Sequence, residues 1–344
     1  MLRRYQFWPV LALIALSGFF ATPATACTVS ASVTTDFGAY SPPAVKAAAV
    51  PALPSRAGLS CPSGVLVLIG NNYVRATFKS RNGLKLSGSA GAFDYTASAD
   101  SDAAVQFAQN GTVDYMQNNL LNLLGLLGGS NADLPFYVKP KGGVMPATGS
   151  YADQITITWD WYLCTGVGAL GLCVGTLDKG TGQAIIDVTM TVEAKTVTTK
   201  LTTLTTWDAA NGTRFPKAIP GSRQRTSLTL ANPDIVPLDS GSVAIVLATP
   251  GGSRVALDGD GSSTGAAIQS SEGSAPSTLA VSYADPASAN DDVDFSADGG
   301  STWSYAPIVG NPASEAAVTH VRVRPRGSMA KQSSFSVSVP YMLQ

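Results

Sequence analysis

The sequence of 344 residues is poor in the side chains that catalytic and metal sites commonly use. It has one histidine, four cysteines and only 13% charged residues, with a formal net charge of -1 at pH 7. A chain with so little charge has no basic surface for nucleic acid and no acidic tail. The charge of the chain therefore indicates no particular class of partner.

The sequence also lacks the short motifs of common catalytic sites. It has no GxSxG, HExxH or Walker motif, and no GxGxxG between a strand and a helix. The single histidine, His320, alternates with Val321 and Val323, which places it on the polar face of an expected strand. We therefore expect no enzyme activity, no cofactor and no metal site, with a secreted hydrolase as a third alternative.

Acidic residues gather in two turn-like segments, DGDGSS and NDDVDFSADGG. Paired carboxylates can perform acid-base chemistry, and their oxygens suit calcium, but neither segment has the EF-hand spacing. We interpret both as solvated turns and keep a structural calcium site as the alternative. The acidic residues are Asp258, Asp260, Asp291, Asp292, Asp294 and Asp298.

Long apolar runs are confined to the amino terminus. Arg3 and Arg4 precede an apolar run over residues 7–20, and Ala24-Thr25-Ala26 has the small-x-small form that signal peptidase accepts. This pattern predicts a secretory signal peptide over residues 1–26 and export through the Sec pathway. Cleavage leaves Cys27 first, which raises lipidation as an alternative, although Ala24 stands where a lipobox usually has leucine. No later run is long enough to cross a bilayer.

Four cysteines in an exported chain predict disulfides, for which three connectivities exist. Cys164 and Cys173 flank TGVGALGL between two strand-like runs, so a bridge across a hairpin is the simplest pairing. Cys27 would then pair with Cys61. Zinc binding is the rival interpretation, but the chain has no short Cys-x-x-Cys pair.

Alternation of apolar and polar residues dominates the rest of the chain. In QITITWDWYL the apolar residues Ile155, Ile157, Trp159 and Trp161 share one face, and the same rhythm returns in AIIDVTMTVEA, SVAIVLA, THVRVRP and SFSVSVPY. Short strands separated by turn residues predict an all-β protein made of immunoglobulin-like β-sandwiches.

The length of the chain favours two domains in tandem after the signal peptide. The cysteine-bearing part gives way to a threonine-rich, cysteine-free part near Lys195, so we expect domains over residues 27–194 and 195–344. The segment TVTTKLTTLTT at this junction is either a linker or a first strand. The alternation of Val197, Leu201 and Leu204 with threonine favours a strand.

The stretch MQNNLLNLLGLLGGSN, residues 116–131, breaks the β rhythm. Met116, Leu120 and Leu123 belong to a series of apolar residues at helical spacing, and glycines can end a short helix after it. Two interpretations stay open. The stretch either closes the core of a sandwich or forms an exposed apolar patch that contacts something else. Leu121 and Leu126 lie off the helical stripe and favour the exposed patch.

Two segments carry a family resemblance, CTVSASVTTDFGAYSP after residue 26 and GSYADQITITWDWYLC, with Cys61 between them. They resemble the secreted spore coat protein U family, whose members build archaic chaperone-usher pili. The ending WDWYLCTGVGALGLCVGTLDKGTGQAIIDVTMTV looks closer to the first domain of two-domain tip subunits. The resemblance implies an immunoglobulin-like sandwich that lacks one strand and receives an extended segment of the next subunit. It also implies a periplasmic chaperone, an outer-membrane usher and pilin subunits as partners.

Cleavage before Cys27 leaves no free extension, so we expect a chain that receives a strand but does not donate one, as a tip subunit would. The second part, with DAANGTRFPKAIPGSRQRTSLTLAN and DDVDFSADGGSTWSYAP, resembles an uncharacterised immunoglobulin-like domain of exported bacterial proteins. Tip subunits are expected to have a second pilin-like domain there. The second part is therefore a substitute base that docks to a fibre, or part of a stand-alone module.

We favour a non-enzymatic surface adhesin or tip-type pilus subunit that is assembled by donor-strand complementation. It would pass through the periplasm to the cell surface, with no membrane span after cleavage, and attach to hydrophobic or host surfaces through apolar loops. The alternative is a stand-alone secreted or periplasmic module with complete immunoglobulin-like domains. The adhesive candidates are Leu120, Leu121, Leu123, Leu124, Leu126 and Leu127 in one loop, and Val167, Leu170 and Leu172 in another.

Overall fold

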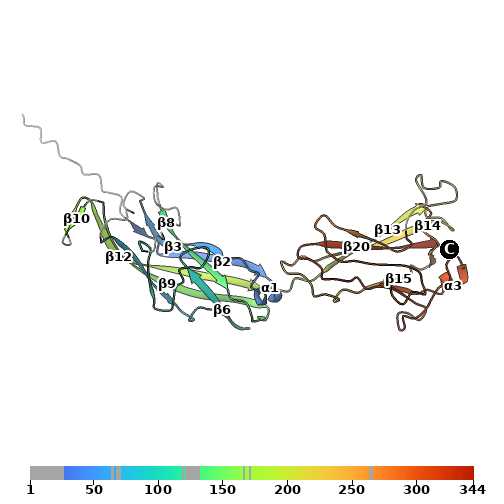
Figure 1. Cartoon of the computed structure of the whole chain (residues 1–344), viewed down its shortest axis with the longest axis horizontal. Coiled ribbons are helices and arrows are strands. Elements are labelled where there is room, and N and C mark those ends of the chain that lie inside the picture. The colour runs from blue at the N-terminus through green and yellow to red at the C-terminus, as the bar shows by residue number, and fades with distance from the viewer. Residues whose placement is uncertain are drawn as a thin grey trace, which may run out of the picture.

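The computed structural model is almost entirely β, which confirms the fold class expected from the alternation. The structure describes residues 27–62, 66, 71–117, 120, 132–165, 167–169, 172–262 and 266–344. Figure 1 shows two elongated β bodies that lie end to end. We call them the first sandwich, with strands β1 to β12, and the second sandwich, with strands β13 to β20.

The first sandwich contains most of the described strands. Its elements are β1 (Thr28–Val29), β2 (Ser32–Tyr40), α1 (Pro42–Lys46), β3 (Leu53–Cys61), β4 (Tyr73–Ser80), β5 (Lys85–Gly88), β6 (Gly91–Ser98), β7 (Thr112–Asp114), β8 (Ala132–Pro140), β9 (Gly149–Cys164), β10 (Val167–Ala169), β11 (Leu172–Val174) and β12 (Leu177–Val192).

These strands pair in two layers. One layer has the order β1-β3-β8-β6, and the other contains β4, β9, β12 and β2, with β7 beside β4. Strand β6 also pairs with β5, which joins the two layers at one side. A constant-type immunoglobulin domain has sheets ABED and CFG. In that scheme β1, β3, β8 and β6 correspond to A, B, E and D, and β4, β9 and β12 correspond to C, F and G.

The long central strands lie where the alternation in the sequence predicts them. In β9, Ile155, Ile157, Trp159 and Trp161 are all buried, as predicted. Strand β12 runs antiparallel to β9 over its full length and turns its own apolar residues to the same core. The predicted strands of the second sandwich are also present, as β15, β19 and β20.

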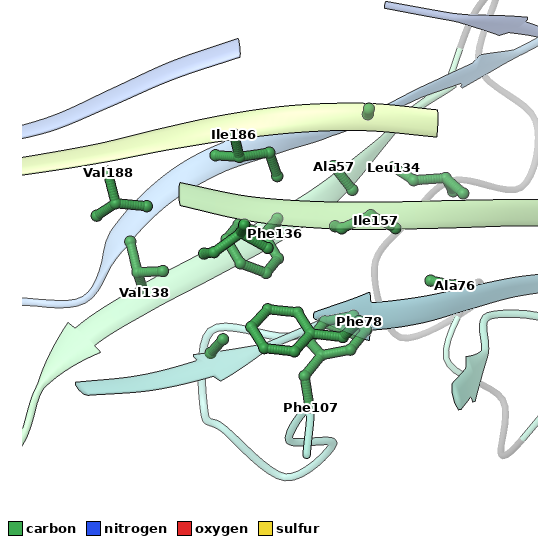
Figure 2. Packing of buried hydrophobic residues seen from close by; sticks show 14 of the residues in the cluster. Ala57, Ala76, Phe78, Phe107, Leu134, Phe136, Val138, Ile157, Ile186 and Val188 are labelled. Carbon is green, nitrogen blue, oxygen red and sulfur yellow. The ribbon is translucent and has the colours of Figure 1, made fainter. Parts of the chain in front are cut away.

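Aromatic rings fill the centre of the first sandwich. The rings of Phe78, Phe107 and Phe136 pack together, with centroids 5.4 to 6.3 Å apart. Figure 2 shows these rings between β4 and β8, with Ile157 and Ile186 above them on β9 and β12. Aromatic side chains bury large apolar areas, so this cluster is a main source of the stability of the first sandwich.

The second sandwich is smaller and has no cysteine. Its elements are β13 (Thr198–Trp207), β14 (Arg223–Ala231), β15 (Ile245–Ala248), β16 (Ser253–Val255), β17 (Gln269–Glu272), β18 (Val293–Ser296), α3 (Pro312–Ala316), β19 (His320–Val323) and β20 (Ser334–Leu343). In the part of the chain that the structure describes, no helix has the length and apolar character needed to cross a bilayer.

The last strand, β20, lies in the middle of the larger layer of the second sandwich. It pairs with β14 on one edge and with β16 and β17 on the other, while β13 continues the layer beyond β14. The opposing layer has the order β15-β19-β18. Phe335, Val337 and Val339 alternate along β20 and point into the core between the layers.

The two sandwiches are in contact where they meet. Strand β12 ends at Val192 and β13 begins at Thr198. Val236, from the connection between β14 and β15, is buried in the core cluster of the first sandwich, and Ile235 packs against that cluster. An apolar anchor therefore supplements the short covalent connection between them.

Candidate functional site

The four cysteines form two disulfides in the first sandwich. Cys27 is joined to Cys61, and Cys164 is joined to Cys173. The first bridge ties Cys27, next to β1, to the end of β3, and the second ties the end of β9 to β11. Both are the pairings that the spacing favours.

The hairpin β10–β11 lies at the end of the first sandwich that points away from the second sandwich (Figure 1). Val174, in β11, is 73% exposed, and Leu177, at the start of β12, is also exposed. Val167 and Leu172 lie on the two strands of this hairpin, whereas Leu170 is outside the described residues. Val174 on the hairpin and Leu177 beside it are thus exposed at this end of the first sandwich, next to the second disulfide.

The leucine stretch differs from the sequence expectation at its first leucine. Leu120 is only 1% exposed and belongs to the core cluster with Met116, so its assignment as an adhesive contact is wrong. A turn brings it inward, because Asp114 accepts hydrogen bonds from the backbone N–H groups of Met116 and Gln117. The candidates Leu121, Leu123, Leu124, Leu126 and Leu127 lie outside the described residues.

The first sandwich has no vacant strand position beside its last strand. Strand β2 pairs in parallel with β12, from Ser32 opposite Ile185 to Tyr40 opposite Val192. Every strand of the seven-strand immunoglobulin scheme has a counterpart here. The expectation of an incomplete first sandwich is therefore wrong for the described residues, because the chain's own β2 occupies the edge of β12.

The second sandwich leaves one long edge open. Strand β13 pairs with β14 from Thr198 to Trp207, and its other edge pairs with no strand in the described part of the chain. Leu201 lies opposite Leu228, whose side chain packs against the core, so both face the core side of the layer. Leu201 is nevertheless 60% exposed, and Leu204, on the outer face, is 70% exposed.

This edge has few of the features that usually protect a strand edge. Natural edge strands are short or carry lysine, proline or a bulge that prevents further pairing. Strand β13 has ten residues, mostly threonine, with Lys200 as its one charged side chain and an irregularity only near its end, between Thr205 and Trp207. Its free edge is thus suited to accept another strand.

The candidate calcium and acid-base carboxylates of DGDGSS are held by arginines. Arg223 makes a two-pronged pair with Asp258, with both N···O distances 2.7 Å, and Arg225 pairs with Asp260 at 2.7 Å. The pKa of Asp258 is lowered by the hydrogen bonds from Arg223. Burial raises the pKa of Asp260, but hydrogen bonds from Ser262 and Arg225 outweigh it and bring the value to about 2. These pairs line a pocket of about 560 Å³, and both carboxylates among the described residues that line it are paired with arginines.

The carboxylates of the second acidic segment also form ion pairs and hydrogen bonds within the fold. Asp292 pairs with Arg326 at 3.1 Å, and Asp294 pairs with Arg322 at 2.8 Å. Asp298 accepts hydrogen bonds from the backbone and side chain of Thr302, which lower its pKa to about 2. No group of three or more metal-ligating side chains occurs among the described residues. Asp291 and Asp292 are buried and Asp294 lies in β18, so the expectation that this segment is a solvated turn is wrong.

The single histidine is half-buried rather than fully on the surface. His320 lies at the start of β19, opposite Ala248 and Ser296 on the neighbouring strands. Among the described residues no serine or cysteine nucleophile forms a hydrogen bond with it, and its Nδ1 atom is buried without a partner.

A comparison with known families finds a match that lies mostly in the first sandwich. Residues 11–158 match the model of the Spore Coat Protein U domain. Over these residues the chain is similar to the Spore Coat Protein U domain. The match confirms the resemblance seen in the sequence, and it ends within β9, so it covers most of the first sandwich and none of the second.

Solved structures and curated proteins add little to this identification. The chain is similar, with 13% identity and a TM-score of 0.39, to a chain of the CsuC-CsuE chaperone-tip adhesion subunit pre-assembly complex from archaic chaperone-usher Csu pili of Acinetobacter baumannii; 91% of this chain and 99% of that chain are covered. It is similar, with 14% identity and a TM-score of 0.20, to a putative membrane anchored protein from Corynebacterium diphtheriae, covering 94% of this chain and 52% of that chain. No curated protein matches the sequence.

Proposed function

We propose that this protein is an exported, non-enzymatic subunit of a chaperone-usher surface fibre. In this role the first sandwich points outward and the second sandwich joins the fibre. The Spore Coat Protein U domain supports the fibre role, and the open edge of β13 is the observation that carries the mode of assembly. Its partners are then a periplasmic chaperone, an outer-membrane usher and a pilin subunit. We also propose that the two sandwiches are separate domains that divide near Lys195.

The joining step is the addition of a partner strand to β13. At roughly 3.3 Å per residue, ten residues offer an edge of about 33 Å, with alternating N–H and C=O groups directed outward. A partner strand would satisfy these groups with backbone hydrogen bonds. Its side chains would also cover Leu201 on the core side and Leu204 on the outer face.

In this proposal the protein attaches to surfaces through the end of the first sandwich that points away from the second sandwich. Val174 and Leu177 are exposed on and beside the hairpin β10–β11, and the disulfide between Cys164 and Cys173 holds the base of that hairpin. Exposed apolar side chains gain about 25 cal/mol for each Å² of apolar surface removed from water. Such a hairpin can adhere to an apolar surface without a specific receptor, and its position leaves the second sandwich accessible to the fibre.

A stand-alone exported binding module is the second candidate. The observation that favours it is the complete first sandwich, in which β2 already fills the edge beside β12. Such a module would need no partner strand and no chaperone to fold. The two candidates therefore differ in whether β13 is used.

A single substitution on β13 separates these candidates. Leu204→Lys places a charge on the open edge, where lysine opposes strand pairing, without removing a buried group. We expect the variant to lose co-purification with a chaperone-usher periplasmic chaperone and incorporation into fibres, while its unfolding free energy stays within about 0.5 kcal/mol.

Val246→Lys is the matched control, because Val246 is an exposed apolar residue on β15 in the opposing layer. It should leave chaperone binding unchanged. Equal loss in both variants would show a general effect of added charge. Unchanged binding in Leu204→Lys would contradict assembly through β13.

A further inference from the structure

A buried carboxylate lies against the first residue after the predicted signal peptide. Asp178, on β12, is 9% exposed. Its Oδ2 atom accepts a hydrogen bond from the backbone nitrogen of Cys27 at 2.6 Å, and its Oδ1 atom accepts one from the indole Nε1 of Trp161 at 3.0 Å. Both carboxylate oxygens are thus occupied by nitrogen donors.

No side-chain cation accompanies this carboxylate. Asp178 forms no ion pair with a lysine, arginine or histidine of the described chain, although ten other ion pairs occur there. A carboxylate removed from water is costly unless a positive charge or several hydrogen bonds compensate it. An amide N–H and an indole N–H supply two hydrogen bonds but no charge.

The sequence offers one source of positive charge at this place. Cleavage after Ala26, which Ala24-Thr25-Ala26 predicts, turns the nitrogen of Cys27 from an amide into a free amino group. We propose that the mature chain begins at Cys27 and that its α-ammonium pairs with Asp178 in a buried site completed by Trp161. Removal of the signal peptide then supplies the missing counter-charge for the folded sandwich.

The surroundings hold this terminus in one position. The Sγ atom of Cys27 is joined to Cys61, and the next two residues, Thr28 and Val29, pair with β3. Because the disulfide uses the thiol, Cys27 cannot also carry the thioether-linked lipid of a lipoprotein. The site therefore fixes a free, unacylated amino terminus, and lipidation at Cys27 is incompatible with it.

The first test is the chemical identity of the terminus. The full gene, with its own leader, is expressed in a bacterium that exports through the Sec pathway, and the purified protein is analysed by intact mass and amino-terminal sequencing. We expect a chain that starts at Cys27, without lipid and with both disulfides formed. A different first residue, or an acylated Cys27, would overturn the proposal.

The second test measures the coupling between the terminus and Asp178. Asp178→Asn is made in the natural mature chain and in a chain that keeps extra residues ahead of Cys27, where the nitrogen is an amide. In the mature chain we expect the unfolding equilibrium constant to rise by on the order of 100-fold or more, and by at least tenfold less in the extended chain. Asp187→Asn, on the same strand but partly exposed, should have equal small effects in both. Equal costs of Asp178→Asn in the two chains would refute the pair.

Labelling of the α-amine keeps the proposal testable if Asp178→Asn does not fold. An amine-reactive ester is applied to the native protein and to the urea-unfolded protein, and Cys27 labelling is followed by mass spectrometry. The buried pair predicts at least tenfold slower labelling in the native protein than in the unfolded one. Equal rates would show that the terminus is free in solution and would contradict the proposal.

Discussion

The two sandwiches are held together by different interactions. The first has two disulfides and a core of packed aromatic rings, and most side chains in its lysine and arginine ion pairs are exposed or half-exposed. The second has no cysteine, and arginine–carboxylate pairs reach into its interior, such as Arg254 with the fully buried Glu315. Both halves have an apolar core, which disulfides supplement in the first sandwich and arginine–carboxylate pairs supplement in the second.

The edges of the sandwiches differ as well. The chain closes the first sandwich itself, because β2 crosses from the layer of β1 to pair with β12. In the described part of the chain, β13 has no partner strand on one side, and leucines are exposed on both of its faces. A closed, cross-linked sandwich is suited to a position exposed to the environment, and a sandwich with an open strand edge is suited to bind a neighbouring subunit.

The largest expected effect comes from the buried carboxylate of the second sandwich. Glu315 accepts hydrogen bonds from Arg254 and from the backbone N–H groups of Leu257 and Gly310. Glu315→Ala leaves Arg254 without its partner, so we expect a loss of about 3–5 kcal/mol in unfolding free energy, confined to the second sandwich. Urea unfolding that resolves the two sandwiches measures it.

The matched control for this substitution is Glu193→Gln, which breaks an exposed pair with Lys195. It should cost less than about 1 kcal/mol. A small effect of Glu315→Ala, similar to that of the control, would contradict the view that charge pairs stabilise the second sandwich.

Loss of the disulfides should affect only the first sandwich. The bridge between Cys27 and Cys61 closes a loop with a sequence separation of 34, and its replacement by serines should cost about 4 kcal/mol. The bridge between Cys164 and Cys173, with a separation of 9, should cost less than about 3 kcal/mol. Denaturant unfolding of each double variant tests this order, and the transition of the second sandwich should not move in either variant.

We expect acid to destabilise the second sandwich more than the first, by a smaller amount than loss of a disulfide destabilises the first. The pKa values of Asp208, Asp260 and Asp298 are lowered to about 2 in the second sandwich, and for Asp208 the main cause is the hydrogen bond from the side chain of Asn211. A lowered pKa gives stability that is present above the unfolded value of about 3.9 and is lost as pH falls toward 2.

In the first sandwich only Asp94 has a lowered pKa among the described carboxyl groups with a resolved shift. Thermal unfolding between pH 5 and pH 2 should therefore show a larger decrease in Tm for the second sandwich. Asp208→Asn should reduce this pH dependence. A first sandwich that is equally sensitive to acid would remove the contrast between the two halves.

The smallest change in stability is expected at the hairpin. Val174→Ser removes an exposed apolar side chain, so it should change the unfolding free energy by less than about 0.5 kcal/mol while reducing attachment to polystyrene. Val144→Ser, in the exposed loop between β8 and β9, is the control and should leave attachment unchanged. Loss of attachment in both variants would show that the effect is not specific to the hairpin.

Local patterns in the sequence were sufficient to predict the central strands. Alternation placed Ile155, Ile157 and Trp159 on the buried face of β9, and it favoured a strand at the segment that forms β13. Alternation depends only on residues within one strand, so it can be read from the sequence without knowledge of the fold.

The features on which the proposed function depends arise from contacts between residues that are far apart in the sequence. Nothing local in SVTTDFGAY shows that β2 pairs with β12, more than 150 residues later, or that Asp178 lies against Cys27. The burial of Leu120 depends on a turn at Asp114, which its leucine-rich context does not reveal. Leu201 is 60% exposed although it lies on the core side of its layer, which alternation alone does not predict.

Hydrogen exchange on the protein alone and in complex with a periplasmic chaperone of the chaperone-usher class tests the central claim most directly. If partner strands join at β13, its outward-facing amides should exchange rapidly in the free protein and become protected in the complex, while β2 and β12 keep the same protection in both states. New protection along β12, together with loss of protection in β2, would show that the partner displaces β2 from the first sandwich, and it would contradict assembly through the second sandwich.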